Sequence, residues 1–152
     1  MRVSVIGGST VDEETYELGV EVGELLGGRG HAVVCGGFGG IMEAACRGAV
    51  EAGGETIGIL SGRDRRAAND WVTTPIVTDL GNARNVLVVL NGDAAIAVDG
   101  ATGTLSEIAH ALDFGRPVAG LETRGVDLEG FEAVETPAAA VEHVEDAVGD
   151  GA

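Results

Sequence analysis

Three short glycine-rich segments contain residue types that suit phosphate binding. Each follows an apolar run and precedes a stretch with helical periodicity: Gly7-Gly8-Ser9-Thr10, Gly36-Gly37-Phe38-Gly39-Gly40 and Gly100-Ala101-Thr102-Gly103-Thr104. Glycine lets the backbone approach a ligand closely, and a following helix offers unpaired N–H groups and a partial positive charge. The candidate phosphate-binding residues are therefore the glycines and hydroxyls of these segments: Gly8, Ser9, Thr10, Gly36, Gly37, Gly39, Gly40, Gly100, Thr102, Gly103 and Thr104.

The same residues also suit a purely structural role. Ser9, Thr10 and Thr102 are of the types that cap helix N-termini, and glycines make tight turns. One such segment would need no ligand, but three at one edge of a sheet favour anion binding. None of them has the G-x-G-x-x-G spacing of a dinucleotide site, so we expect a ligand of mononucleotide size.

Glu107 and Arg84 are the candidate catalytic residues. Glu107 falls in the first turn of the predicted helix after Thr104. A carboxylate there either complements the helix dipole, a gain of ~0.3–1 kcal/mol, or projects toward a ligand and holds a ribose hydroxyl or a water. Arg84 falls near the start of another predicted helix, where a cation opposes the dipole. We therefore expect an anion, from a ligand or a partner carboxylate, to hold Arg84 in place.

A second group of arginines lies after a predicted strand. Arg63, Arg65 and Arg66 are three of the nine basic residues and fall within four positions. Such a cluster suits a mobile, anion-attracting lid, and it equally suits a solvated loop or a subunit contact.

The sequence predicts no metal site. Cys35 and Cys46 lack the spacing of metal ligands, and we interpret them as reduced core residues. Glu107 and His110 form one Glu-x-x-His pair, but no further ligands accompany it, so packing is the favoured role of His110.

The elements that must position these residues alternate along the chain. Short apolar runs that stop at turns predict strands at Val3–Ile6, Ala32–Cys35, Thr56–Leu60, Pro75–Val77, Ala94–Val98, Pro117–Leu121 and Phe131–Val134. Helical periodicity predicts helices at 11–26, Ile41–Ala52, Asn82–Leu90, Thr102–Phe114 and Ala138–Val148.

Strands that alternate with helices imply parallel βαβ units. We therefore predict an α/β fold: a single doubly wound, Rossmann-like domain over residues 1–152, with a mostly parallel sheet flanked by helices. In such sheets ligands bind beyond the carboxyl ends of the strands, where the strand order reverses. The three glycine segments should meet at that edge.

Composition narrows the classes of function. The 152 residues carry a formal net charge of -16, and all nine basic residues are arginine. This acidity argues against binding to nucleic acid or anionic membranes and suggests a halophilic protein. Without lysine the chain cannot host a Walker A loop or a pyridoxal phosphate Schiff base. With no apolar run long enough to span a membrane, and no signal peptide, we expect a cytoplasmic protein.

Three segments resemble a known family. GGFGGIMEAACRGAVEAGG (36–54), ARN (83–85) and DGATGTLSEIAHAL (99–112) are similar to the Lonely-guy and molybdenum cofactor carrier group of Rossmann-like proteins, and the likeness extends to about Leu121. The resemblance implies a homodimer or homotetramer. It matches Glu107 to the catalytic glutamate, Arg84 to the motif arginine, and Gly100, Gly103 and Thr104 to the phosphate loop.

Two departures from the family pattern bear on activity. Asp99-Gly100-Ala101 stands where the family has Pro-Gly-Gly, and Asn85 follows Arg84 where the enzymes usually have lysine. A carboxylate about 4 Å from a phosphate charge costs ~1 kcal/mol in water and ~4 kcal/mol at an effective dielectric of 20. The Arg-Asn pair is closer to the carrier and uncharacterised members.

The main hypothesis is a protein that binds a nucleotide-like phosphate ligand and hydrolyses the N-glycosidic bond of a nucleoside 5′-monophosphate, with no cofactor required. The alternative is a non-catalytic carrier or sensor of molybdenum cofactor or a related phosphorylated pterin.

Overall fold

The structure is a computed structural model that describes residues 1–100 and 102–151. Ala101, part of the third glycine segment, lies outside the described residues. Within the described ranges one sheet contains seven strands in the order β4-β3-β2-β1-β5-β6-β7, and every neighbouring pair is parallel. The strands are β1 (Arg2–Gly7), β2 (Ala32–Cys35), β3 (Thr56–Leu60), β4 (Thr74–Val77), β5 (Ala94–Val98), β6 (Val118–Leu121) and β7 (Phe131–Val134).

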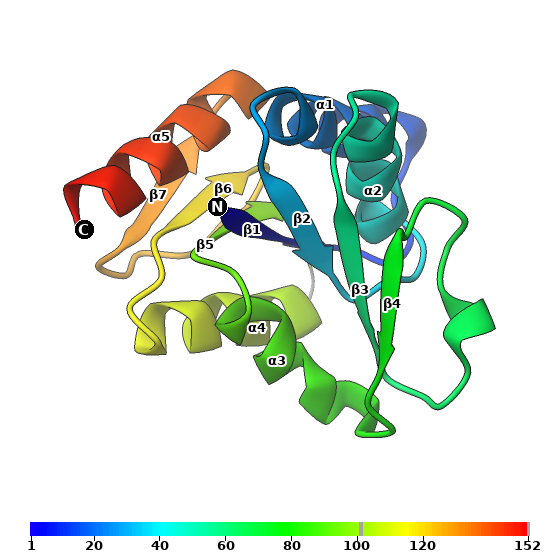
Figure 1. Ribbon diagram of the computed structural model, residues 1–152. Coiled ribbons are helices and arrows are strands. Elements are labelled where there is room, and N and C mark those ends of the chain that lie inside the picture. The colour runs from blue at the N-terminus through cyan, green and yellow to red at the C-terminus, as the bar shows by residue number, and fades with distance from the viewer. Residues whose placement is uncertain (101, 152) are drawn as a thin grey trace.

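Helices cover both faces of this sheet (Figure 1). One face carries α1 (Glu13–Gly28), α2 (Ile41–Glu51) and α5 (Pro137–Asp150). The opposite face carries α3 (Asn85–Leu90) and α4 (Thr102–Asp113). Two short 3-10 helices, η1 (Arg65–Ala67) and η2 (Gly81–Arg84), lie on either side of β4 in the sequence. The predicted doubly wound, Rossmann-like α/β fold is confirmed.

Strand β5 shows why the sequence forms two cores. All five of its side chains are buried. Ala94, Ile96 and Val98 pack with residues of α1, α2 and α5, whereas Ala95 and Ala97 pack with residues of α3 and α4. Side chains alternate across a strand, so a strand covered on both faces must be apolar at every position. The continuous apolar run of the sequence is therefore the signature of a central parallel strand.

The strand order reverses between β1 and β5. From β1 the chain builds β2, β3 and β4 outward on one side, and β5, β6 and β7 follow on the other side. A hydrogen bond connects the loop after β1 to the start of α2, which follows the loop after β2: the backbone N–H of Ile41 donates to the carbonyl of Gly8 at 3.0 Å. A doubly wound sheet binds ligands at this point of reversal.

The helix expected over Asn82–Leu90 is divided in the structure. Gly81–Arg84 forms the 3-10 helix η2, and only Asn85–Leu90 is α-helical. Hydrogen bonds from Arg84 to backbone carbonyls of two other segments hold this turn against the strand ends. Across the described residues, no helix combines the length and apolar character needed to cross a membrane.

Candidate functional site

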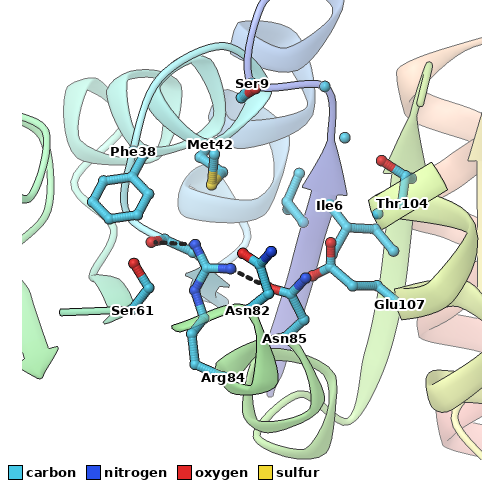
Figure 2. A pocket seen from close by; sticks show the side chains of 15 residues that line it. Ile6, Ser9, Phe38, Met42, Ser61, Asn82, Arg84, Asn85, Thr104 and Glu107 are labelled. Atoms are coloured by element: carbon cyan, nitrogen blue, oxygen red, sulfur yellow. Dashed lines mark hydrogen bonds between the residues drawn. The ribbon is translucent and has the colours of Figure 1, made fainter. Parts of the chain in front are cut away.

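A cavity of about 300 Å³ opens at the carboxyl edge of the sheet, next to the point where the strand order reverses. Its walls come from the loops after β1, β2 and β3, from η2 and α3, and from the first turns of α4 (Figure 2). Seven of the candidate residues named from the sequence line this cavity: Gly8, Ser9, Gly36, Arg84, Gly103, Thr104 and Glu107. The structure thus brings parts of all three glycine segments together with the candidate carboxylate and guanidinium.

The other candidates lie outside this cavity. Thr10 is exposed, and Gly37, Gly39 and Gly40 shape the loop after β2. The carbonyl of Gly37 accepts a hydrogen bond from the backbone N–H of Asn69 at 2.8 Å. A Cβ on Gly40 would lie 2.2 Å from the carbonyl oxygen of Gly8, so this position must be glycine for the two loops to touch. Gly100 and Thr102 line a second cavity.

Neither Ser9 nor Thr10 caps a helix in the structure. The N-cap of α1 is Asp12, whose carboxylate accepts the Thr15 N–H at 2.8 Å. The N-cap of α2 is Gly40, which has no side chain to offer. Ser9 therefore lines the cavity without a capping role.

Arg84 is the most firmly held polar side chain of the site. Its side chain is only 8% exposed, with Nε donating to the Ile59 carbonyl at 2.9 Å and Nη2 to the Gly36 carbonyl at 3.3 Å. Nη1 donates to Oδ1 of Asn85, and the ring of Phe38 lies 5.5 Å from the guanidinium carbon. Burial lowers the pKa of Arg84, while the charges of Glu107 and Cys35 oppose that shift. A guanidinium carries five N–H groups, so two remain for a ligand.

The partner expected for Arg84 was a ligand anion or a carboxylate. Among the described residues no carboxylate lies within 4.0 Å of its guanidinium, and backbone carbonyls hold it instead. Gly36 makes this possible, because a Cβ there would lie 2.7 Å from Nη2 of Arg84 and 2.8 Å from the Met42 sulfur. Gly36 therefore provides the space that Arg84 occupies.

Glu107 lies on α4 and faces Arg84 across the cavity, with Asn82 and Asn85 between them in this view (Figure 2). Its carboxyl contacts no hydrogen-bond or ion-pair partner in the part of the chain that the structure describes. Burial raises the pKa of Glu107 to about 7, and the positive charge of Arg84 acts in the opposite direction. A carboxyl with this pKa can accept or donate a hydrogen bond near neutral pH.

Eight lining residues were not among the sequence candidates: Val5, Ile6, Gly7, Phe38, Met42, Ser61, Asn82 and Asn85. Ser61 directly follows β3, so the rule that ligands bind beyond the carboxyl ends of parallel strands would have found it. Asn82 and Asn85 are three positions apart, a spacing that places side chains on one face of a helical turn. That spacing in the sequence could have indicated that the two side-chain amides lie on the same side of the turn.

Asp99 lines the second cavity, of about 230 Å³. Its lining includes Asp99, Gly100, Thr102, Thr104 and Arg124, and only Thr104 also lines the first cavity. Asp99 has a left-handed backbone (φ 55°), and its N–H donates to the Leu121 carbonyl at 2.8 Å. The carboxylate that replaces the family proline is therefore not part of the first cavity's wall.

The clustered arginines do not line the first cavity either. Arg63 pairs with Asp79 at 2.8 Å and Arg66 with Asp64 at 3.1 Å, and both arginines are exposed. Arg65 is exposed as well. The cluster forms a loop that is partly neutralised by its own carboxylates.

The remaining candidates are structural in their contacts. The sulfurs of Cys35 and Cys46 lie 3.4 Å apart as buried free thiols. The ring of His110 stacks on Phe114 with centroids 6.4 Å apart. Over residues 1–100 and 102–151, no group of three or more histidine, cysteine, aspartate and glutamate side chains is arranged to hold a metal ion.

The fold and the cavity define a Rossmann-like α/β protein with a polar pocket at the carboxyl edge of its sheet. The sequence profile of the SLOG cluster4 family matches residues 1–148, and the chain belongs to this family. An uncharacterised protein of Archaeoglobus fulgidus is 46% identical over 143 residues, covering 94% of this chain and 93% of the relative.

Two solved structures extend the comparison. The molybdenum cofactor carrier protein of Chlamydomonas reinhardtii superposes with a TM-score of 0.90 at 31% identity, covering 97% of this chain and 98% of the other. The molybdenum cofactor binding protein of the phototrophic bacterium Rippkaea orientalis gives a TM-score of 0.87 at 32% identity, covering 95% of each chain. The family resemblance inferred from the sequence is confirmed.

Proposed function

We propose that this protein binds and carries molybdenum cofactor or a closely related phosphorylated pterin. The observation that carries the proposal is the cavity, which combines an immobilised guanidinium with an unpartnered carboxyl. Its size is at the lower end of the range for small-molecule sites. The likeness to two molybdenum cofactor proteins over nearly the whole of each chain supports the same ligand class.

Charge favours an anionic ligand at this position. Arg84 is the one basic side chain among the described residues that line the cavity, and it retains two unused N–H groups. The hydroxyls of Ser9 and Thr104 and the backbone of Gly8 and Gly103 add further groups of the kind that bind phosphate. In a chain of net charge -16, this cavity gives an anion a local positive partner.

Co-purification tests the carrier function. The protein is expressed in cells that make molybdenum cofactor, purified, and analysed for molybdenum by mass spectrometry and for pterin by fluorescence after oxidation. We expect both in a constant ratio to protein, and a loss of about tenfold or more in Arg84→Gln. The matched control is Arg65→Gln, which changes an exposed arginine outside the cavity. Molybdenum and pterin no higher than in an unrelated purified protein would reject the proposal.

Phosphoribohydrolase activity is the second candidate. It is supported by Glu107, because a carboxyl with a pKa of about 7 suits general acid or base chemistry at a glycosidic bond. The purified protein in high salt should then release ribose 5-phosphate from AMP or another monophosphate, and Glu107→Ala should abolish the release. Absence of turnover across a panel of monophosphates would exclude this activity.

The assembly and environment of the protein remain predictions. We expect a homodimer or homotetramer that binds no nucleic acid or membrane, in a cytoplasmic, halophilic setting. Light scattering in high and low salt measures the assembly. A DNA mobility shift at micromolar protein would contradict the expectation about nucleic acid.

A further inference from the structure

The hydrogen-bonding groups left unused in the cavity have a definite arrangement. Oδ1 of Asn85 accepts a hydrogen bond from Arg84, which fixes the orientation of the Asn85 amide. The Nδ2 group of Asn85 donates to no other residue in the described chain, and Figure 2 shows it on the side of the Glu107 carboxyl. Glu107 likewise has no partner among these residues. The two carboxyl oxygens of Glu107, which can accept hydrogen bonds, therefore lie next to a donor, the Nδ2 group of Asn85.

Planar heterocycles differ in the hydrogen-bond donors and acceptors that they present to a carboxylate and an amide N–H. The pyrimidine ring of a pterin presents a carbonyl (O4), a ring N–H (N3) and an amino group on C2 along one edge. A carboxylate can accept from two adjacent N–H donors at once, as carboxylates do with guanidinium groups. An amide N–H beside it suits the carbonyl. Guanine has the same edge, hypoxanthine lacks the amino group, and adenine presents an amino group where guanine has its carbonyl.

The cavity also has surfaces for the faces of a ring. Ile6, Phe38 and Met42 line it together with the polar groups. Phe38 and Met42 lie on one wall, and Glu107 lies on the opposite side in Figure 2. Aromatic and thioether groups pack well against a flat ring, while polar groups at the edge select its orientation.

We propose that Glu107 and Asn85 recognise the 2-amino-4-oxopyrimidine edge of the bound ligand. The carboxylate of Glu107 accepts hydrogen bonds from the ring N–H and the 2-amino group, and the Asn85 amide donates to the 4-oxo group. This assignment rests on the proposed carrier function, because it names the part of the ligand that enters the cavity. It makes both side chains specificity determinants.

Two pairs of ligands that differ at the edge test the assignment. GMP and IMP differ only in the 2-amino group, and pterin and lumazine differ in the same position. We expect titration calorimetry to show GMP binding at least about tenfold more tightly than IMP, and pterin more tightly than lumazine, as expected for a bidentate contact. Equal affinities within either pair, or no binding of GMP and pterin at millimolar concentration, would overturn the inference.

Variants separate recognition from folding. Glu107→Gln is nearly isosteric and should bring GMP and IMP within about twofold of each other, because glutamine has one acceptor and one donor at its tip. The control Glu24→Gln, on the exposed face of α1, should keep the wild-type ratio. Asn85→Asp exchanges the donor for an acceptor, so preference should move from GMP toward AMP. A variant series without these changes in ratio would contradict the assignment.

The pH dependence gives an independent readout. Two N–H donors require the ionised carboxylate, so GMP affinity should rise as the pH passes through about 7, where Glu107 ionises, and level off above that value. Within residues 1–100 and 102–151, the charged and titratable groups that interact electrostatically with Glu107 are the Arg84 guanidinium and the Cys35 thiol. The Gln variant should show no such rise. Affinity that falls over this range would overturn the inference.

The two proposals fail in different ways. Protein that carries molybdenum and pterin out of the cell but does not distinguish GMP from IMP keeps the carrier function and loses this edge assignment. Protein that carries no cargo and binds neither ligand pair loses both.

Discussion

Glycine has opposite uses in two regions of this molecule, the contact between α1 and α2 and the cavity at the sheet edge. In the helix contact, a Cβ on Gly23 would lie 2.1 Å from the Ala45 carbonyl oxygen, and one on Gly48 would lie 2.0 Å from that of Val20. Backbone meets backbone there, and no space is left. At Gly36 the nearest atoms are the ends of the Arg84 and Met42 side chains. Glycine therefore allows close packing of backbones between α1 and α2, whereas at the cavity it makes room for the side chains of Arg84 and Met42.

The contrast shows how a core poor in aromatic residues can still support a precise site. Only 3% of the residues are aromatic, so large rings cannot fill the space between helices and sheet. Close approach of α1 and α2 through glycine and alanine removes that space instead. The rigid contact lies on one face of the sheet. Asn85 and Glu107, which have unused hydrogen-bonding groups, lie on the helices of the other face.

The largest expected effect on stability comes from adding a side chain within the contact between α1 and α2. Gly48→Ala places a methyl group against the Val20 carbonyl, and because both atoms are fixed by helices, we expect a loss of about 3 kcal/mol or more in the free energy of unfolding. The control is Gly28→Ala, at the end of α1, where a Cβ would meet nothing within 4 Å. That variant should be as stable as the wild type or slightly more so. Urea denaturation measures both, and equal stabilities would show that the contact between α1 and α2 has room for a methyl group.

Arg84→Lys tests the firmly held part of the cavity. Lysine keeps the charge but cannot make the forked contacts with the Ile59 and Gly36 carbonyls and with Asn85. We expect a loss of about 2–3 kcal/mol in stability, because buried carbonyls lose charged donors. We also expect loss of the co-purified ligand.

Urea denaturation and molybdenum content measure these two effects of Arg84→Lys. Arg63→Lys, at an exposed ion pair, is the control and should change neither. Unchanged stability of Arg84→Lys would show that the guanidinium is not part of the rigid frame.

The pH dependence of stability tests the open part of the cavity. The pKa of Glu107 is about 7 in the folded protein, against an ordinary value of 4.5. The carboxyl of Glu107 therefore binds its proton more tightly in the folded state than in the unfolded chain. The stabilisation from this protonation is complete below pH 4.5 and is lost as the pH rises to 7. Glu107→Gln removes that loss.

Because water enters the open cavity and reduces the effect, we expect the Gln variant to be about 1–2 kcal/mol more stable than the wild type at pH 8. The two should be equal near pH 4.5. Denaturation at a series of pH values measures the difference, and parallel curves for the two proteins would contradict the assigned pKa.

The fold was predictable because its signals are local. Glycine pairs such as Gly7-Gly8 and Gly53-Gly54 end strands or helices, and apolar runs such as Ala94–Val98 are long enough for a strand buried on both faces. The position of the cavity followed from the rule about strand order. These features depend on residue type and spacing, which a sequence displays.

The environment of Arg84 could not be predicted in the same way. An anion was the expected partner, but the structure supplies the carbonyls of Ile59 and Gly36. Every residue has a carbonyl, so nothing in the sequence marks these two as acceptors. Arg84 reaches these carbonyls from the 3-10 turn of η2, which the helical pattern of Asn82–Leu90 did not reveal. Tertiary packing decides such contacts.

The smallest expected effect concerns the outer face of α1, whose inner face makes the closed contact. Glu17, Glu21 and Glu24 are exposed, and Glu21 lies about one turn from each of the other two along this face. Like charges at such spacings destabilise a helix slightly, and salt screens the repulsion. Glu21→Gln should therefore raise the melting temperature by about 1 °C at low salt and not at all in molar salt.

The wild type should itself melt at a higher temperature in molar salt than at low salt, because its net charge of -16 opposes the compact state. Differential scanning calorimetry at both salt concentrations measures the two effects. A wild-type melting temperature that falls as salt increases would show that the acidic surface is not adapted to salt. The effects of Gly48→Ala and Arg84→Lys, by contrast, should be the same at either salt concentration, because packing and buried hydrogen bonds are screened little.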